Sequence, residues 1–185
     1  MRVALALVVS SLLTGATPTT ADNAAQEPQA KAAPVDRWAP LRFLLGTWEG
    51  TTTGQPGHGT VRREYRLVLR DRFIEVRNTS TYPPQEKNPK GEVHEDVGYI
   101  SYDRARKAFV FRQFHAEGFV NTYVSGPDVT LPVVFTSEGI ENIPAGWRAR
   151  ETYRMNGDEL LEVFELAEPG KDFATYSEAR LKRSR

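Results

Sequence analysis

The sequence has 185 residues, a formal net charge of +0 and no cysteine. This length suits one domain with a substantial core, and the balanced charge excludes the basic field with which proteins attract nucleic acid or anionic lipid. The lack of cysteine excludes disulfides, thiolate metal sites, a cysteine nucleophile and a lipid-anchored N-terminal cysteine.

The N-terminus is predicted to be a signal peptide that spans residues 1–21. Arg2 precedes the apolar run 3–13, and small residues that suit cleavage follow at Ala16 and Ala21. The apolar run is short for a membrane span, and an uncleaved N-terminal anchor is the alternative to a signal peptide. We therefore expect export to the periplasm or the medium, with no membrane span after removal of the signal.

Residues 22–35 are rich in alanine, glutamine and proline and show no periodicity, which predicts a disordered linker. The domain is expected to occupy residues 36–185. It opens at 36–45, where apolar residues near helical spacing predict a short helical turn that covers one end of a barrel.

The rest of the domain is predicted to consist of short strands separated by turn signals. In chain order the expected strands are 46–54, 59–69, 73–82, 93–102, 108–116, 119–124, 130–137, 147–155, 159–166 and 173–181. A proline-rich loop, 83–91, is longer than a hairpin needs. The pattern predicts an all-β fold, a single up-and-down antiparallel β-barrel of about ten strands.

Alternation along the strand 147–155 separates its two faces. The arginines at even positions must face water, so Glu151 and Tyr153 are expected to point inward. On 108–116 one face carries Gln113 and His115 and the other carries Arg112, and both faces are apolar enough to leave the orientation open. The candidate ligand-binding residues are Gln113, His115, Glu138, Glu151, Tyr153 and Arg112.

An inward Glu138 or Glu151 would have a raised pKa unless it were paired, and Arg112 or Arg77 would be the partner. Such pairs more often anchor a ligand or support the structure than catalyse, so no catalytic residue is assigned and the balance is against an enzyme. The order His94-Glu95-Asp96 puts only two possible ligands on one face of a strand, so no metal site is predicted.

The opening Gly46-Thr47-Trp48 resembles that of the calycin superfamily, which includes lipocalins and fatty-acid-binding proteins. The longer pattern Gly46-x-Trp48-x-Gly50-x-x-x-Gly54 is more similar to the start of nitrobindin-like haem-binding β-barrels, with Thr52 where that family repeats glycine. The stretches 82–91, 112–115 and 147–153 resemble exported bacterial proteins of unknown function that carry this kind of domain.

The resemblance implies a barrel with a ligand cavity and a closed end formed by Gly46 and Trp48. In lipocalins a basic side chain of the last strand packs over this tryptophan, a role that falls here to Arg180 or Lys182. We expect these residues to close the barrel rather than to bind a ligand.

Nitrobindin-like barrels hold haem iron through a histidine late in the chain. The histidines here are His58, His94 and His115, so no position matches that ligand, and His115 is the one substitute candidate.

The sequence therefore favours an exported barrel that binds a small hydrophobic or amphipathic molecule, mostly apolar with a polar or acidic group. One alternative is a nitrobindin-like haem barrel that acts on nitrogen oxides. The other is an envelope protein-interaction module without ligand, its interior filled by side chains. No cofactor is predicted, haem remains possible, and the oligomeric state is left open.

Overall fold

A computed structural model describes residues 36–86 and 88–184 of the chain. The predicted signal peptide and linker, residues 1–35, lie outside the described residues. The elements are η1 (Ala39–Leu44), β1 (Gly46–Gly54), β2 (Gly57–Val68), β3 (Phe73–Tyr82), β4 (Glu92–Asp103), β5 (Ala108–His115), β6 (Val120–Ser125), β7 (Val133–Glu141), β8 (Arg148–Asn156), β9 (Glu159–Ala167) and β10 (Ala174–Arg183).

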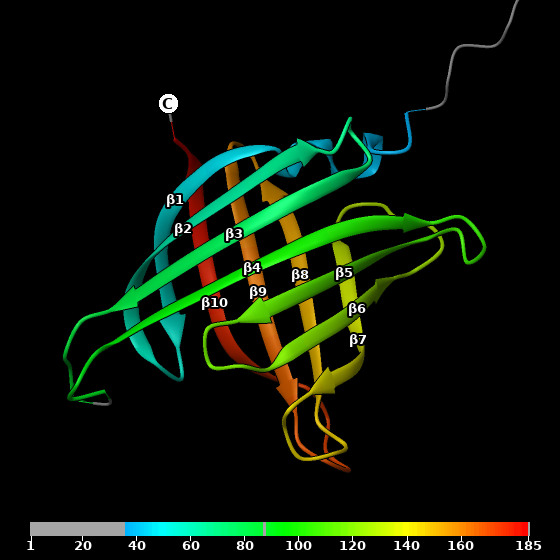
Figure 1. Cartoon of the computed structure of the whole chain (residues 1–185). Coiled ribbons are helices and arrows are strands. Elements are labelled where there is room, and N and C mark those ends of the chain that lie inside the picture. The colour runs from blue at the N-terminus through cyan, green and yellow to red at the C-terminus, as the bar shows by residue number, and fades with distance from the viewer. Residues whose placement is uncertain (1–35, 87, 185) are drawn as a thin grey trace, which may run out of the picture. The chain divides into compact units, whose positions relative to one another are not determined.

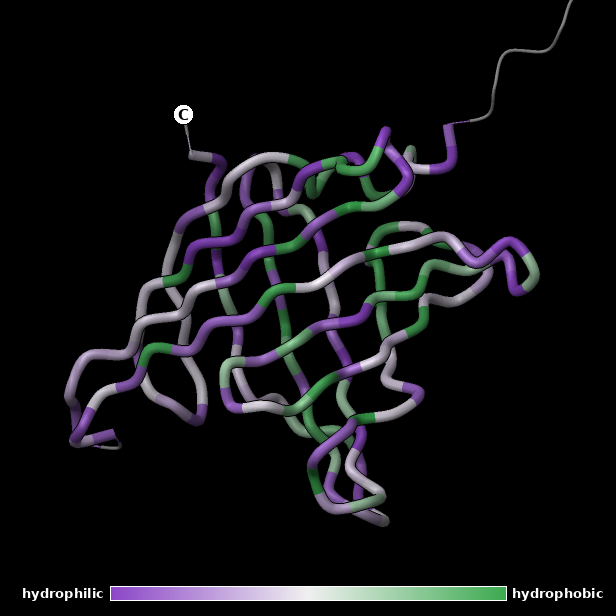
Figure 2. Tube along the Cα trace, in the orientation of Figure 1, coloured by the Kyte–Doolittle hydropathy of each residue, from purple (hydrophilic) through white to green (hydrophobic). Residues whose placement is uncertain are grey.

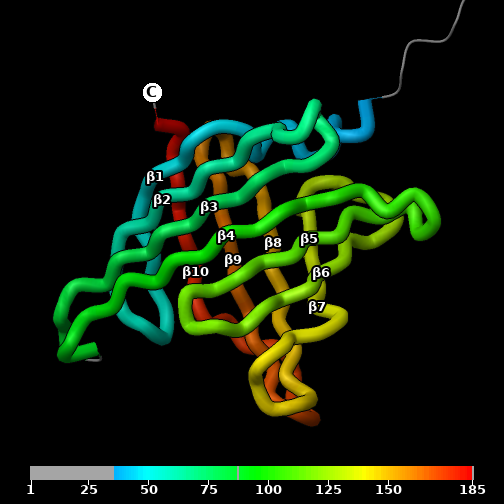
Figure 3. Tube along the Cα trace, in the orientation of Figure 1, coloured from blue at the N-terminus to red at the C-terminus, as the bar shows by residue number. Residues whose placement is uncertain are grey.

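The ten strands form one closed antiparallel barrel. Each strand pairs with its neighbours in chain order, and β1 pairs with β10 to complete the ring (Figures 1 and 3). The predicted fold class and all ten strands are thus confirmed. The largest shift is at β7, expected at 130–137, which starts at Val133 because Pro132 has no N–H to donate to a strand ladder.

Hydrophobic and hydrophilic residues are interspersed along the strands, as expected when one face of each strand lines the barrel and the other meets solvent (Figure 2). Among the residues that the structure describes, no helix has the length and apolar character needed to cross a membrane.

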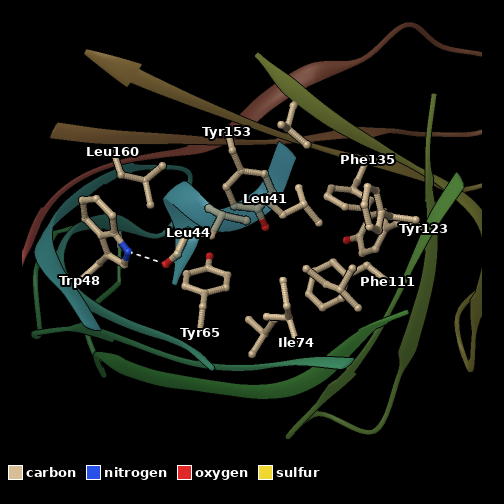
Figure 4. Close-up of a cluster of buried hydrophobic side chains, with 14 of the residues drawn as sticks. Leu41, Leu44, Trp48, Tyr65, Ile74, Phe111, Tyr123, Phe135, Tyr153 and Leu160 are labelled. Atoms are coloured by element: carbon tan, nitrogen blue, oxygen red, sulfur yellow. Dashed lines mark hydrogen bonds between the residues drawn. The ribbon is translucent and has the colours of Figure 1, made fainter. Parts of the chain in front are cut away.

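One end of the barrel is closed by η1 and packed with apolar side chains. Leu41 and Leu44 of η1 are fully buried, and the indole of Trp48, 1% exposed, donates a hydrogen bond of 2.7 Å to the Leu44 carbonyl (Figure 4). This bond satisfies the only polar atom of a large buried ring. Trp48 therefore packs inside the end of the barrel that η1 covers.

The basic cover over the Trp48 indole is Arg183, and the expectation of Arg180 or Lys182 was wrong. The Arg183 guanidinium lies 4.3 Å from the ring centroid, because Arg183 is the direct partner of Trp48 across β1 and β10. Arg180 has the opposite parity, so it faces outward and pairs with Glu159 at 3.3 Å.

Candidate functional site

A cavity of about 490 Å³ occupies the end of the barrel opposite η1. Its lining comes from the barrel interior and from the turns β1–β2, β5–β6 and β7–β8. The described part of loop 83–91 contributes no lining residue. Five carboxyl groups face the cavity against one arginine and two histidines: Glu92, Asp96, Glu117, Glu151 and Glu162 against Arg63, His94 and His115. The cavity is therefore apolar in part and rich in hydrogen-bond acceptors.

Glu151 of β8 lies at the floor of this cavity and is 6% exposed. Burial, together with the charge of Glu162, raises the pKa of Glu151 to about 8. Its carboxyl accepts a hydrogen bond from the Tyr153 hydroxyl, two residues along the same strand. At neutral pH Glu151 is therefore largely protonated, and it can donate as well as accept.

A buried ion pair joins Arg63 of β2 to Glu162 of β9, with a shortest distance of 3.0 Å. Burial opposes the charge of Arg63, but Glu162 more than offsets it and raises the arginine pKa above its usual value. The remaining Arg63 donors bond to the carbonyls of Arg62 and Thr79 and to the hydroxyl of Ser80. The guanidinium is thus held by Glu162 and by the wall of the barrel.

Asp96 of β4 is held by two buried amides. Its Oδ1 accepts hydrogen bonds of 2.8 Å from both Asn78 and Gln113. The carboxylate fixes both amides with their N–H groups toward it, since a flipped amide would set oxygen against oxygen. The carbonyl oxygens of Asn78 and Gln113 are consequently buried without a hydrogen-bond partner.

His94, His115 and Glu117 meet at the wall of the cavity. His94 Nδ1 lies 2.8 Å from Glu117 Oε1, and His94 Nε2 lies 3.3 Å from His115 Nδ1 and 3.6 Å from Asp96 Oδ2. Asp96 and Glu117 raise the pKa of His94 to about 9 despite partial burial. Burial, with the adjacent His94 charge, lowers the pKa of His115 to about 4, so this second ring is neutral.

The structure brings together three of the residues predicted to bind a ligand. Gln113, His115 and Glu151 line the cavity, which settles the orientation of β5, and Tyr153 is buried behind Glu151.

The other two predicted ligand-binding residues are not in the cavity. Arg112 is exposed, because it has the parity opposite to Gln113. Glu138 is also exposed and pairs with Arg106 at 2.6 Å. Arg77, expected as a partner for Glu138 or Glu151, instead pairs with Glu75, which is buried on the outer face of the barrel.

Sequence reasoning missed the Arg63–Glu162 pair and the polar cluster around Asp96. A signal for Arg63 was present, since it lies between Val61 and Tyr65 on a face that is otherwise apolar. The cluster around Asp96 had no such signal in the sequence, because its members come from different strands. They meet only through the register of those strands, which places Asp96 of β4 opposite His115 of β5.

These features define a class: a closed calycin-type β-barrel with a cavity of ligand size. The interior is not filled by side chains, contrary to what the interaction-module alternative assumed. Within this class the chain belongs to the family described as THAP4-like, heme-binding beta-barrel domain, whose model matches residues 37–183. The expected likeness to nitrobindin-like barrels is confirmed.

A solved structure shares the fold of this barrel. The crystal structure of Rv2717c from M. tuberculosis is 19% identical, has a TM-score of 0.62, and is matched over 82% of this chain and 99% of its own. A fluorescence-activating β-barrel designed de novo is 15% identical with a TM-score of 0.38, over 76% of this chain and 93% of its own. No curated protein sequence gives a significant match.

The residues of the cavity do not fit haem in the manner of the family. No histidine follows His115 in the sequence, so the late iron ligand has no counterpart. Both ring nitrogens of His115 are in contact with protein, Nδ1 with His94 at 3.3 Å and Nε2 with Asn121 at 3.1 Å. Arg63, the arginine that lines the cavity, is already paired with Glu162 and bonded to the Thr79 carbonyl, so a propionate would have to compete with Glu162 for it.

Proposed function

We propose that this barrel binds a small, mostly apolar molecule whose polar group donates hydrogen bonds. The observation that carries the proposal is the imbalance of hydrogen-bonding groups at the cavity: its charged donors, Arg63 and His94, contact acidic groups of the protein, and several buried amide oxygens have no partner. The sequence left a polar or an acidic group open, and this imbalance favours a neutral or cationic donor.

The donor side of the balance rests on Arg63 and His94. Arg63 is bound by Glu162 and by backbone oxygens, and both His94 nitrogens face carboxylates or His115. An acidic ligand would therefore have to displace an internal carboxylate. Bringing another negative charge beside Asp96 and Glu162 would also cost Coulomb energy in a poorly solvated site.

The acceptor side of the balance rests on buried amide oxygens. Those of Asn78, Gln113 and Asn121 have no hydrogen-bond partner, and a buried unpaired acceptor costs about 1–3 kcal/mol. A hydroxyl or an amine that reached these oxygens through a local shift of the wall would regain part of that energy. We therefore expect the polar end of the ligand to lie toward β3, β4, β5 and β6, the strands of these residues and of Asp96.

The apolar part of the ligand has a matching apolar surface across the cavity from β3, β4, β5 and β6. Strand β7, the β7–β8 loop and strand β9 line the cavity with Ile140, Ile143, Pro144, Trp147, Phe164 and Leu166. Burial of a ring or chain against this surface would contribute about 25 cal/mol per Å² of apolar area.

The test compares three naphthalene probes that differ only in the attached group: naphthol, naphthylmethylamine and naphthoate. Binding to the purified chain is followed by probe fluorescence. The alcohol and the amine are expected to bind at least tenfold more tightly than the carboxylate. A carboxylate that binds most tightly would overturn the proposal.

Matched glutamate variants show whether the probes bind inside the barrel. Glu151→Gln removes a carboxyl at the cavity floor and is expected to change probe affinity. Glu138→Gln removes an exposed carboxyl and is expected to leave it unchanged. Equal effects of the two changes would indicate binding at the surface.

Haem binding is the second candidate, supported by membership of the family. His115 would be the iron ligand, and its ring is held in place by Phe119, whose centroid lies 4.0 Å away. Titration with hemin tests this candidate: a Soret shift that saturates at one equivalent and is lost in His115→Ala supports it. Because no histidine matches the late iron ligand of nitrobindin-like barrels, we expect no such shift.

Export remains part of the proposal and rests on the signal-peptide pattern of residues 1–21. A reporter enzyme that is active only outside the cytoplasm, fused after residue 185, would test it. An inactive but stably produced fusion would contradict export.

A further inference from the structure

A cluster of three possible metal ligands lies in the cavity wall, contributed by two paired strands and the turn that follows. His94 comes from β4, His115 ends β5, and Glu117 is in the β5–β6 turn. The turn is fixed by backbone hydrogen bonds: the Gly118 N–H bonds to the His115 carbonyl at 2.8 Å and the Ala116 N–H to the Glu95 carbonyl at 2.9 Å.

Gly118 adopts a φ of +90°, a left-handed conformation that glycine accepts without strain. The backbone thus returns Glu117 toward the two histidines in a defined geometry.

The distances in this cluster suit a tetrahedral ion. One ligand atom from each residue lies within 4.8 Å of the other two, and His94 Nε2 lies 3.3 Å from His115 Nδ1. Ligands held at the zinc–nitrogen distance of about 2.0–2.1 Å are roughly 3.3–3.4 Å apart in a tetrahedron, so this pair already has the required spacing. Glu117 is the most exposed of the three and can adjust by a change of rotamer.

We infer that His94, His115 and Glu117 form a three-ligand site for a divalent transition metal such as zinc, with its fourth position open to the cavity. Two imidazoles and one carboxylate make up a donor set known from zinc sites that keep an open position. Imidazole favours zinc, copper and nickel over magnesium and calcium, which prefer oxygen. This inference goes beyond the proposed function and does not depend on it.

Asn121 supplies an independent observation that points to the same ion. It is 1% exposed, and its carbonyl oxygen has no hydrogen-bond partner while its amide nitrogen lies 3.1 Å from His115 Nε2. A half-turn of the amide would present the oxygen to a protonated Nε2 and leave Nδ1 free to bind metal. Histidines that bind metal usually donate their other N–H to such an acceptor.

The surroundings of the two histidines also suit a cation. Asp96, held by the amides of Asn78 and Gln113, places its second oxygen 3.6 Å from His94 Nε2, so a negative charge lies beside the position of the ion. The ring of His115 stacks on Phe119. The His115 imidazole is therefore oriented before any ion binds, which lowers the entropic cost of binding.

The test measures zinc binding to the full chain, carrying no histidine tag and stripped with chelator, by calorimetry and by metal analysis after dialysis. One zinc ion per chain is expected, with excess magnesium unable to compete. His94→Ala and His115→Ala should each weaken binding at least 100-fold, more than the roughly 10- to 100-fold cost of losing an outer-shell partner. His58→Ala changes an exposed histidine on β2 and should leave affinity unchanged.

A second readout guards against variants that merely unfold. Cobalt bound to the folded wild-type chain should give the visible absorption of a four-coordinate site, and Glu117→Gln, a change at a partly exposed side chain, should alter this spectrum. No zinc binding by wild type, or full affinity in both His94→Ala and His115→Ala, would overturn the inference. Because no organic ligand takes part, failure here is distinct from failure of the naphthalene assay.

Discussion

Glu151 makes the stability of the barrel depend on pH, in a direction opposite to that of most carboxylates. Its pKa is raised from the ordinary 4.5 to about 8 by burial and by the charge of Glu162. Between these two values the unfolded chain releases the proton and the folded chain keeps it. The free energy of unfolding should therefore fall as pH rises through this window and level off above about pH 8.

The size of the effect follows from the two pKa values. Linkage gives a loss of about 1.4 kcal/mol per pH unit inside the window, or about 2.5 kcal/mol between pH 5.5 and pH 7.5. Glu151→Gln removes the titration and keeps both an acceptor for Tyr153 and the shape of the protonated acid. The free energy of unfolding of the variant, relative to that of wild type, should therefore rise by about 2.5 kcal/mol between pH 5.5 and pH 7.5.

The assay is urea unfolding followed by tryptophan fluorescence at several pH values, for wild type and variant in parallel. Taking the difference cancels the titration of His94 and His115, which also have shifted pKa values. Glu138→Gln serves as the control and should give a difference that does not depend on pH. A constant difference between wild type and Glu151→Gln across pH 5.5–7.5 would refute the reasoning.

Two further predictions concern the frame of the barrel. Arg63→Met leaves Glu162 buried without its partner and should cost about 3–5 kcal/mol in urea unfolding, whereas the double variant Arg63→Met/Glu162→Leu should recover most of that loss; a single variant as stable as wild type would contradict the pairing. Gly50→Ala would place a Cβ 1.8 Å from the Arg180 carbonyl oxygen, so calorimetry should show a Tm lower by roughly 10 °C. Gly139→Ala meets no atom within 4 Å and should leave the Tm nearly unchanged, and similar losses in both variants would contradict the packing argument.

The strands could be predicted from the sequence because the signals for them are local. The alternation of polar and apolar residues, the Asn156-Gly157 turn and the apolar residues before Trp48 are each recognised within a few residues. In an up-and-down barrel every strand pairs with the next strand in the chain, so the order of the strands in the sheet follows once the strands are known. The inward Glu151 was predictable for the same reason, since three arginines mark the opposite face of β8.

The site could be predicted only in part because it depends on register. Trp48 is paired with Arg183 rather than Arg180 through the alignment of β1 with β10, which no local pattern reveals. His94 and His115 meet through the alignment of β4 with β5. A shift of one residue in either ladder would reverse the faces, so these contacts are properties of the closed barrel and not of any single strand.

The two ends of the barrel satisfy their polar groups in different ways, and this contrast is the strongest argument for function. At the η1 end the indole N–H of Trp48 is paired and most of the interior is apolar, with the Tyr65 hydroxyl as a buried group without a partner. At the other end the chain keeps Glu151 and the Arg63–Glu162 pair buried, and leaves amide oxygens such as that of Gln113 without partners. Apolar residues of similar volume would cost less in stability at several of these positions. Buried charges and buried polar groups without partners, which lower stability, concentrate at functional sites. Because the η1-capped end already provides a mostly apolar core, the polar end is where a ligand and a metal ion would recover the stability that these groups cost.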